Sequence, residues 1–282
     1  MIITGAAKIA GVMGWPISHS LSPRLHGFWL DQYNIDGAYL PLAVTPERFE
    51  SAVRALPELG FKGANVTVPH KEAAFAAMDK LSETAKRLGA VNTIVIGNDG
   101  ELHGDNTDGY GFMENLTAGG SRLELKGQTV VVLGAGGAAR AIVAALCDAG
   151  VSEVRLVNRT RARAEALAEE LGGAILPLAK SDISEALNGA ALLVNTTSLG
   201  MSGHEALNID LAPLPTNALV TDIVYNPLDT PLLVQARKKG CQTINGIGML
   251  LHQARPGFAA WFGVEPEVTT ELREYVLAGL DG

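Results

Sequence analysis

Apolar residues along the chain follow two patterns in turn: short runs rich in Val, Ile and Leu, and longer stretches with an apolar residue at every third or fourth position. The first pattern is typical of buried strands, and the second of helices that pack by one face. Their alternation predicts an α/β fold, with parallel sheets covered by helices on both faces. In the first half, strands are expected at 8–14, 37–44 and 61–68, and helices at 22–34, 46–60 and 71–89, the last broken near Ser82.

Residues 90–109 are expected to form two short strands around an Asn-Asp-Gly turn, followed by a helix at 110–120. The strongest local pattern comes next, at 127–160: a β-branched strand, a glycine turn, an apolar helix and a second strand. Further strands are expected at 191–198 and 218–225, and further helices at 161–173, 230–240, 250–263 and in the C-terminal tail.

The composition indicates a large packed core. Of 282 residues, 47% are hydrophobic and 18% charged, and this length suggests about two domains. The net charge of −8 disfavours a nucleic-acid partner. No apolar run reaches the ~18 residues needed to cross a membrane, and the start of the chain does not read as a signal peptide. Cys147 and Cys241 have neither metal nor disulfide spacing, and the histidines are scattered, so we expect a cytoplasmic protein without a bound metal.

The glycine turn carries the clearest chemical signal. Gly134, Gly136 and Gly137 follow a β-branched run, and Ala138 lies at the start of the apolar helix. Such a turn lets the backbone approach a pyrophosphate, which the positive end of the helix then faces. A tight strand-to-helix turn without a nucleotide is the alternative for the same residues.

The end of the next strand indicates which nucleotide is bound. Sites for NAD usually place Asp or Glu there, on the ribose 2′-hydroxyl. This chain has Asn158, followed by Arg159, Thr160 and Arg163. No carboxylate repels a 2′-phosphate there, and guanidinium groups can hold one, so we expect NADP rather than NAD. For Arg161 we expect a surface ion pair with a glutamate instead.

Lys71 stands in the first turn of a predicted helix, where the helix dipole disfavours a cation by ~0.3–1 kcal/mol. A lysine at such a place can serve as the general acid or base when a hydride is transferred to a carbonyl carbon. The carboxylate of Asp108 would hold the lysine in place. A surface lysine is the alternative, and for the neighbouring His70 we expect a solvent-facing side chain.

Polar residues also gather where the apolar strands of the first half end. They are Ser18, Ser20, Asn65, Thr67 and Asn92. In open α/β sheets, ligands bind beyond the carboxyl ends of the strands. Hydroxyl and amide groups both donate and accept hydrogen bonds, which suits a polyhydroxylated substrate. Each residue alone also has a structural explanation, since a serine can cap a helix and an asparagine can fill a turn.

In order along nearly the whole chain, these motifs resemble the shikimate dehydrogenase family. The resemblance rests on PISHSLSP, GANVTVPHKE, LGAVNT, GDNTDGYG, VVVLGAGGAARA, VNRT, NTTSLGM, DIVYNPLDTPLL and NGIGMLLHQA. It implies two domains, a split α/β substrate domain (1–108 and 245–282) and a Rossmann-like doubly wound NADP-binding domain (109–244). It also implies NADP-dependent, reversible reduction of 3-dehydroshikimate to shikimate, in the biosynthesis of chorismate and the aromatic amino acids.

The resemblance implies roles for individual residues as well. Lys71 would be the catalytic acid or base, and Asp108 its partner; no metal is implied. The substrate-binding residues would be Ser18, Ser20, Asn65, Thr67, Asn92, Tyr225 and Gln253. The cofactor-binding residues would be Gly134, Gly136, Gly137, Ala138, Asn158, Arg159, Thr160, Arg163, Ile223 and Gly246. Four of these, Tyr225, Gln253, Ile223 and Gly246, come from the resemblance alone.

Two other activities are compatible with these motifs. One is a quinate/shikimate dehydrogenase with a broader choice of substrate and cofactor, which the Ser18–Ser20 pair and Asn158 disfavour. The other is a catalytically silent NADP-binding sensor, which the presence of Lys71 and Asp108 disfavours. We expect a small-molecule substrate as the partner, and a monomer or a homodimer.

Overall fold

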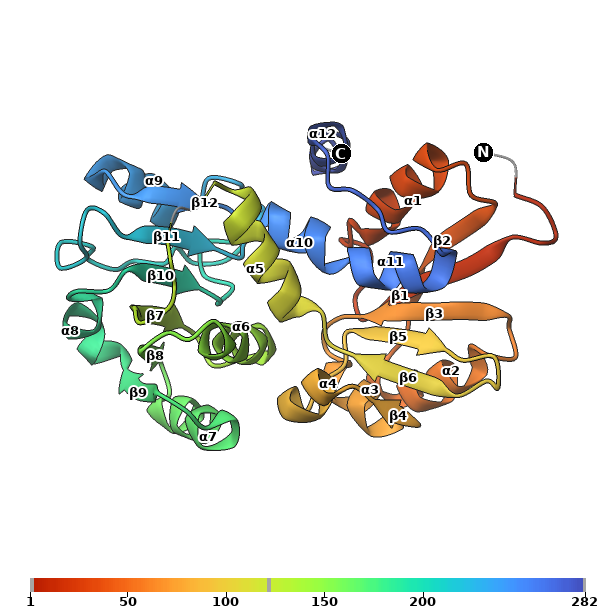
Figure 1. Ribbon diagram of the computed structural model, residues 1–282, viewed down its shortest axis with the longest axis horizontal. Helices are drawn as coiled ribbons and strands as arrows, with labels where there is room; N and C mark the ends of the chain where they lie inside the picture. Colours follow the sequence, from red (N-terminus) through yellow and green to blue (C-terminus); the bar gives the residue numbers. More distant parts are fainter. Residues whose placement is uncertain (1–2, 121–122, 281–282) are drawn as a thin grey trace. The chain divides into compact units, whose positions relative to one another are not determined.

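The chain divides into two compact units in a computed structural model that describes residues 3–120 and 123–280. Unit 1 consists of Met1–Thr107 and Leu251–Gly282, and unit 2 of Asp108–Leu250. Each unit is built on its own six-stranded sheet, drawn in Figure 1.

The sheet of unit 1 is mixed. Its strands are β1 (Lys8–Gly14), β2 (Gly37–Ala43), β3 (Phe61–Val66), β4 (Lys80–Leu81), β5 (Thr93–Ile96) and β6 (Leu102–Asp105), in the order β2-β1-β3-β5-β6-β4. β1 pairs with β2 and β3 in parallel, but β5 is antiparallel to both β3 and β6. The two short strands expected around the Asn-Asp-Gly turn are confirmed as the β5–β6 hairpin. The expectation of a wholly parallel sheet is wrong here, because β5 also runs antiparallel to β3.

Helices cover both faces of this sheet. They are α1 (Ser22–Gln32), α2 (Phe49–Ala55), α3 (Lys71–Ala77), α4 (Glu83–Leu88), α11 (Arg255–Phe262) and α12 (Thr270–Leu277), with a short 3₁₀ turn, Pro46–Arg48, before α2. The break expected near Ser82 is confirmed, since the Ser82 hydroxyl caps α4 by accepting from Ala85 N (3.0 Å). On β3, Ala64 and Val66 belong to the cluster that includes residues of α2 and α3. Gly63 faces Trp261 of α11 on the other side, as the two-residue period of a strand requires.

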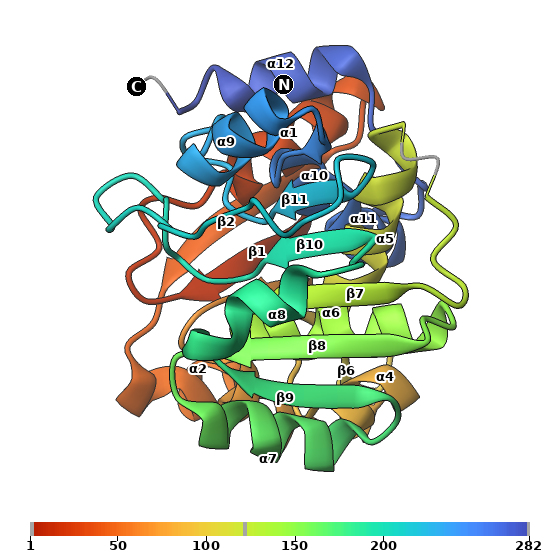
Figure 2. The ribbon, with the colours of Figure 1, turned by 90° about the vertical axis from the view of Figure 1, so that its left-hand side faces the viewer.

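The sheet of unit 2 is parallel throughout. Its strands are β7 (Thr129–Leu133), β8 (Glu153–Asn158), β9 (Ile175–Ala179), β10 (Leu192–Asn195), β11 (Leu219–Asp222) and β12 (Gln242–Ile244), in the order β12-β11-β10-β7-β8-β9. Most of this order can be followed across the sheet in Figure 2. The chain moves outward from β7 to β9 on one side and from β10 to β12 on the other. The order thus reverses between β7 and β10, which is where doubly wound folds bind dinucleotides.

Two apolar cores sandwich this sheet, as a doubly wound fold requires. The helices of the unit are α5 (Asp108–Ala118), α6 (Gly137–Asp148), α7 (Arg161–Leu171), α8 (Ile183–Leu187), α9 (Pro231–Lys239) and the first part of α10 (Ile247–Gln253), with a 3₁₀ turn, Lys180–Asp182, before α8. The last three residues of α10 belong to unit 1. Val130 and Val132 of β7 pack with α5, α6 and α7. Val131 and Leu133 pack on the opposite face with α8 and α9. The expected Rossmann-like architecture is confirmed.

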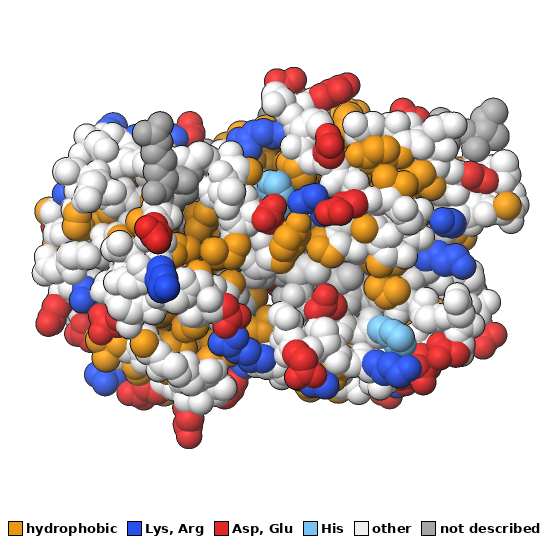
Figure 3. All heavy atoms as spheres, viewed as in Figure 1, with side chains coloured by type: hydrophobic (Ala, Val, Ile, Leu, Met, Phe, Trp, Pro, Cys, Tyr) orange, Lys and Arg blue, Asp and Glu red, His pale blue; other side chains and the backbone are white. Residues whose placement is uncertain are grey.

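Within residues 3–120 and 123–280, each helix is too short or too polar to cross a bilayer. The surface in Figure 3 carries acidic and basic side chains interspersed on the face shown.

Candidate functional site

The glycine turn of unit 2 lies at the reversal point of the sheet. Gly134 follows β7 with φ +106°, and a Cβ there would lie 2.7 Å from Thr196 Oγ1 of the segment after β10. Only glycine suits this position, because both the conformation and the neighbour exclude a side chain. Thr196 Oγ1 also donates to Leu133 O (2.6 Å), which joins the carboxyl ends of β7 and β10.

Gly136 and Gly137 differ from Gly134, because both are exposed and a Cβ on either would meet no heavy atom within 4 Å. Packing within the described chain therefore gives no reason for glycine there, whereas close approach of a ligand does. Gly136 is the N-cap of α6, and no side chain caps this helix. The first N–H groups of α6, including that of Ala138, are thus suited to a pyrophosphate, and the turn fits a dinucleotide.

The segment after β8 presents cationic side chains without a carboxylate. Asn158 ends β8, and its Nδ2 donates to Thr160 O (2.8 Å). Arg161 pairs with Glu165 (2.9 Å), as expected. Arg159 and Arg163 are exposed, and neither has a carboxylate partner among the described residues. This arrangement fits a ribose 2′-phosphate better than a 2′-hydroxyl.

The ends of β11 and β12 meet beside a glycine. A Cβ on Gly246 would lie 2.1 Å from Ile223 O, so no larger residue fits there. Tyr225 follows two residues after Ile223, and burial raises the pKa of its phenol. Asp222 is fully buried, and desolvation raises the pKa of its carboxyl group. Asn195 Nδ2 donates to Asp222 Oδ1 (2.9 Å), which ties β10 to the segment that carries Ile223 and Tyr225.

In unit 1 the predicted substrate residues lie at one edge of the sheet. β1 and β3 are parallel, so Ser18 and Thr67, which follow them, lie at the same edge. Thr67 N donates to Met13 O (3.0 Å), which fixes these two strand ends together. Ser18 is exposed, and Ser20 is half-buried, with its Oγ accepting from Ser22 N (3.3 Å).

Three other predicted substrate residues form one hydrogen-bonded group. Asn65 Nδ2 donates to Asn92 O (3.2 Å), and Asn92 Nδ2 lies 3.5 Å from Gln253 Oε1. Thr107 joins the last two residues, because its N–H donates to Asn92 Oδ1 (2.9 Å) and its hydroxyl to Gln253 O (2.8 Å). β3, the start of β5 and the end of α10 thus contribute to one site. Within the described residues, no hydrogen bond joins Ser18 or Ser20 to this group.

Lys71 is the first residue of α3 and is half-buried. Its carbonyl accepts from Val91 N (2.9 Å), which places the start of α3 beside the segment that precedes β5 and contains Asn92. Asp108 opens α5 in unit 2 and is buried. The predicted pairing of the Lys71 and Asp108 side chains stays a prediction.

The expectation for His70 is wrong. The residue is only 1% exposed, and its ring stacks on Phe49 with the centroids 4.6 Å apart. His70 Nε2 lies 2.7 Å from Val44 O, a backbone acceptor from an earlier segment that the local sequence does not reveal. The contacts of His70 therefore fix the start of α3, where Lys71 is the first residue.

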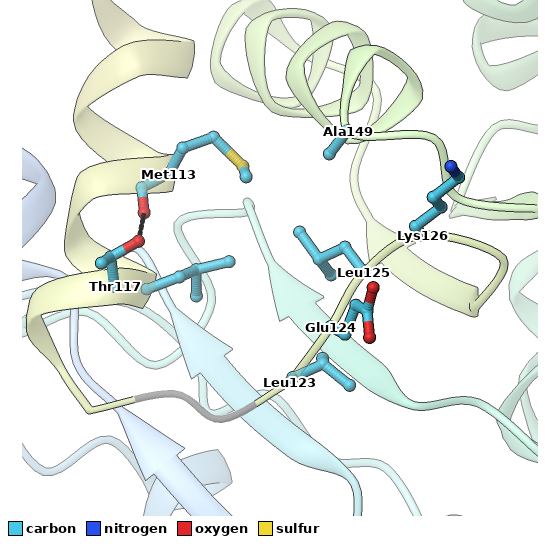
Figure 4. A pocket seen from close by; sticks show the side chains of 8 residues that line it. Met113, Thr117, Leu123, Glu124, Leu125, Lys126 and Ala149 are labelled. Atoms are coloured by element: carbon cyan, nitrogen blue, oxygen red, sulfur yellow. Dashed lines mark hydrogen bonds between the residues drawn. The ribbon is translucent and has the colours of Figure 1, made fainter.

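A pocket in unit 2 lies away from these residues. Met113, Thr117, Leu125, Lys126 and Ala149 are among the residues that line it, as Figure 4 shows. Ala149 follows the last residue of α6, so the pocket lies at the opposite end of this helix from the glycine turn. It contains none of the predicted site residues.

The chain is similar to known proteins over nearly its whole length. Residues 12–94 match the family described as shikimate dehydrogenase substrate binding domain, and residues 117–212 match shikimate / quinate 5-dehydrogenase. The shikimate dehydrogenase (NADP(+)) of Paramagnetospirillum magneticum is 58% identical over 276 residues, which cover 98% of this chain and 100% of that protein. The chain belongs to the shikimate dehydrogenase family.

Solved structures of shikimate dehydrogenase and of a related enzyme share the fold. The shikimate 5-dehydrogenase of Thermus thermophilus, in complex with NADP(H) and shikimate, is 38% identical with a TM-score of 0.86, covering 96% of this chain and 99% of that one. The quinate dehydrogenase of Corynebacterium glutamicum, in complex with NAD, is 32% identical with a TM-score of 0.89, covering 96% of this chain and 99% of that one.

Several polar residues that support the site in this shikimate dehydrogenase family member were missed in the sequence. Asn195 and Asp222 end two neighbouring apolar strands, and Thr93 and Thr107 adjoin Asn92 and Asp108. A polar residue directly at the end of an apolar strand was the available signal for Asn195 and Asp222, and for Thr93 and Thr107 it was their position beside predicted site residues. Their partners come from other strands, so sequence spacing alone does not reveal the contacts.

Proposed function

We propose that the chain catalyses the reversible, NADP-dependent reduction of 3-dehydroshikimate to shikimate, in the biosynthesis of chorismate and the aromatic amino acids. The observation that carries this proposal is the exposed Gly136–Gly137 turn, followed after β8 by exposed arginines in place of a carboxylate. These features support NADP as the cofactor. The family and the named relatives supply the substrate.

In the proposed division of labour, the split domain (1–108 and 245–282) holds most of the substrate and the intervening domain holds NADP. Lys71 transfers the proton to or from the substrate oxygen, and Asp108 orients its ammonium group. The carboxylate and hydroxyl groups of the substrate are bound by Ser18, Ser20, Asn65, Thr67, Asn92, Tyr225 and Gln253.

NADPH, when bound, would supply the hydride that reduces the carbonyl carbon. The chain would hold its pyrophosphate with Gly134, Gly136, Gly137 and Ala138 and its 2′-phosphate region with Asn158, Arg159, Thr160 and Arg163. Ile223 and Gly246 would lie beside the nicotinamide. We further infer a cytoplasmic monomer or homodimer whose ligands are small molecules.

A second candidate is a dehydrogenase that also accepts quinate and NAD. It is suggested by the structural similarity to the quinate dehydrogenase of Corynebacterium glutamicum, whose structure contains NAD, but a shikimate dehydrogenase solved with NADP+ has the same TM-score of 0.89. Asn158 argues against it, since it offers no carboxylate to a ribose 2′-hydroxyl.

The test is an absorbance assay at ~340 nm, where reduced nicotinamides absorb, with shikimate or quinate and with NADP or NAD. The expected result is rapid reduction of NADP in the presence of shikimate, and no comparable rate for any other pair of substrate and cofactor. Comparable rates with quinate or NAD would favour the second candidate. Binding of NADPH without turnover of either substrate would indicate a catalytically silent sensor.

A further inference from the structure

A row of buried side chains joins two of the proposed substrate-binding residues of unit 1. Asn65 of β3 lies directly opposite Thr93 of β5 in the antiparallel pair, and Asn92 precedes Thr93. Asn65 is 5% exposed, Asn92 and Thr93 are each 2% exposed, and Thr107 is 3% exposed. Polar groups at this depth need hydrogen-bond partners, so the pattern of their bonds fixes how each side chain is oriented.

The hydrogen bonds of this row run in one direction. The Tyr39 hydroxyl donates to Asn65 Oδ1 (2.6 Å), and Asn65 Nδ2 donates to Thr93 Oγ1 (3.2 Å). Thr93 Oγ1 donates to Asn92 Oδ1 (2.9 Å), and Asn92 Nδ2 donates to Thr107 Oγ1 (3.1 Å). An amide oxygen only accepts and an amide nitrogen only donates, so each bond dictates the direction of the next.

Thr93 stands between the two amides and uses its hydroxyl in both directions. It accepts a hydrogen bond from Asn65 Nδ2 and donates one, with its single hydrogen, to Asn92 Oδ1. We propose that Thr93 is a positioning residue, whose hydroxyl holds the amides of Asn65 and Asn92 in the orientation that binds the substrate. This inference rests on the proposed function for the identity of that substrate.

Thr93→Val tests the hydroxyl, because valine keeps the shape of the side chain and removes the oxygen. Each asparagine then loses one partner in a buried setting, which is expected to raise KM for shikimate by about tenfold. The value of kcat is expected to stay within about threefold, since Thr93 itself does not exchange a proton with the substrate. KM for NADP should not change. Thr93→Ser restores the hydroxyl and should return KM for shikimate to near the wild-type value.

Thr221→Val is a matched control, because Thr221 is also a buried strand threonine (1% exposed) but belongs to β11 of unit 2. It should leave KM for shikimate unchanged. An unchanged KM in Thr93→Val, or a raised KM that Thr93→Ser fails to restore, would overturn the proposal. If Thr93→Val does not fold, Thr93→Ala compared with Thr93→Ser isolates the same hydroxyl.

A second measurement separates this inference from the proposed function. The side-chain amide resonances of Asn65 and Asn92 in nitrogen-15 NMR spectra report their hydrogen bonds directly. They should shift in Thr93→Val and keep their positions in Thr93→Ser. If the wild type turns over neither shikimate nor quinate, the proposed function fails, and these resonances still decide whether Thr93 positions the two amides. Unmoved resonances in Thr93→Val would refute the positioning role.

Discussion

His26 should make the stability of unit 1 depend on pH between 5 and 7. The residue is fully buried, with its ring stacked 3.9 Å from that of Tyr39. Desolvation lowers the pKa of His26 from 6.5 to about 3. The unfolded chain therefore binds a proton here at a pH where the folded chain does not.

The direction and the size of this pH dependence follow from the difference in proton binding between the folded and unfolded chain. At pH values above 6.5 the His26 ring is mostly neutral in both the folded and the unfolded chain. Stability is then lost progressively as the pH falls from 6.5 towards 3, because only the unfolded chain binds the proton. Between pH 7 and pH 5 the His26 contribution amounts to about 2 kcal/mol, at about 1.36 kcal/mol per unit of pKa difference. Exposed carboxyl groups whose pKa values are lowered, such as Asp79, titrate below this window and do not contribute to it.

Urea unfolding followed by tryptophan fluorescence would measure this loss. Trp15, Trp29 and Trp261 all lie in unit 1, so the signal reports this unit. His26→Phe keeps an aromatic ring and removes the titrating group, so its stability should change about 2 kcal/mol less between pH 7 and pH 5 than that of the wild type. His204→Gln, at an exposed histidine, should behave as the wild type. An equal loss in His26→Phe and in the wild type would refute the reasoning.

Three further predictions concern residues of the proposed site, two through the reaction and one through stability. Lys71→Ala should lower kcat by ~10²–10⁴-fold with little change in KM for shikimate, and near wild-type turnover would disprove the acid–base role. Arg159→Ala should raise KM for NADPH by ~10-fold or more without changing KM for NADH. Arg161→Ala serves as the control, because this arginine is already paired with a glutamate. An equal rise in KM for NADPH in both variants would argue against a 2′-phosphate contact. Gly246→Ala should destabilise unit 2 by about 3 kcal/mol, because its Cβ would lie 2.1 Å from Ile223 O, and calorimetry showing an unchanged melting temperature would contradict this.

The parts of the fold that depend on neighbouring residues were predictable from the sequence. The strand, turn and helix from Thr129 to Asp148 follow directly from a β-branched run, glycines and an apolar helix. The break in the helix after Lys71 was also predicted, because Ser82 is a strong N-cap residue. β4, β9 and β12 were missed, since all three are edge strands, and the residues of β9 are half-buried or exposed without an apolar alternation.

Features that depend on pairing between distant segments were not predictable. The antiparallel arrangement of β3 with β5 decides that Asn65 faces Thr93, and periodicity alone does not specify this register. His70 is buried because Phe49 and Val44 of an earlier segment enclose it. Ile223 has an apolar side chain and Gly246 has none, so neither shows a polar group that would point to a site. Only the family resemblance indicated them.

Unit 1 is discontinuous in sequence. Its synthesis therefore begins first and is completed last, after the whole of unit 2. Residues 251–282 supply α11, whose Phe258 and Trp261 are buried in unit 1, and Trp261 Nε1 donates to Ile94 O (2.9 Å). Unit 2 is one continuous segment that can fold while the ribosome still holds the end of the chain. At ~5–20 residues per second, the sheet of unit 1 then waits on the order of ten seconds for its covering helix. During this interval the apolar surface that α11 later covers is exposed on the nascent chain.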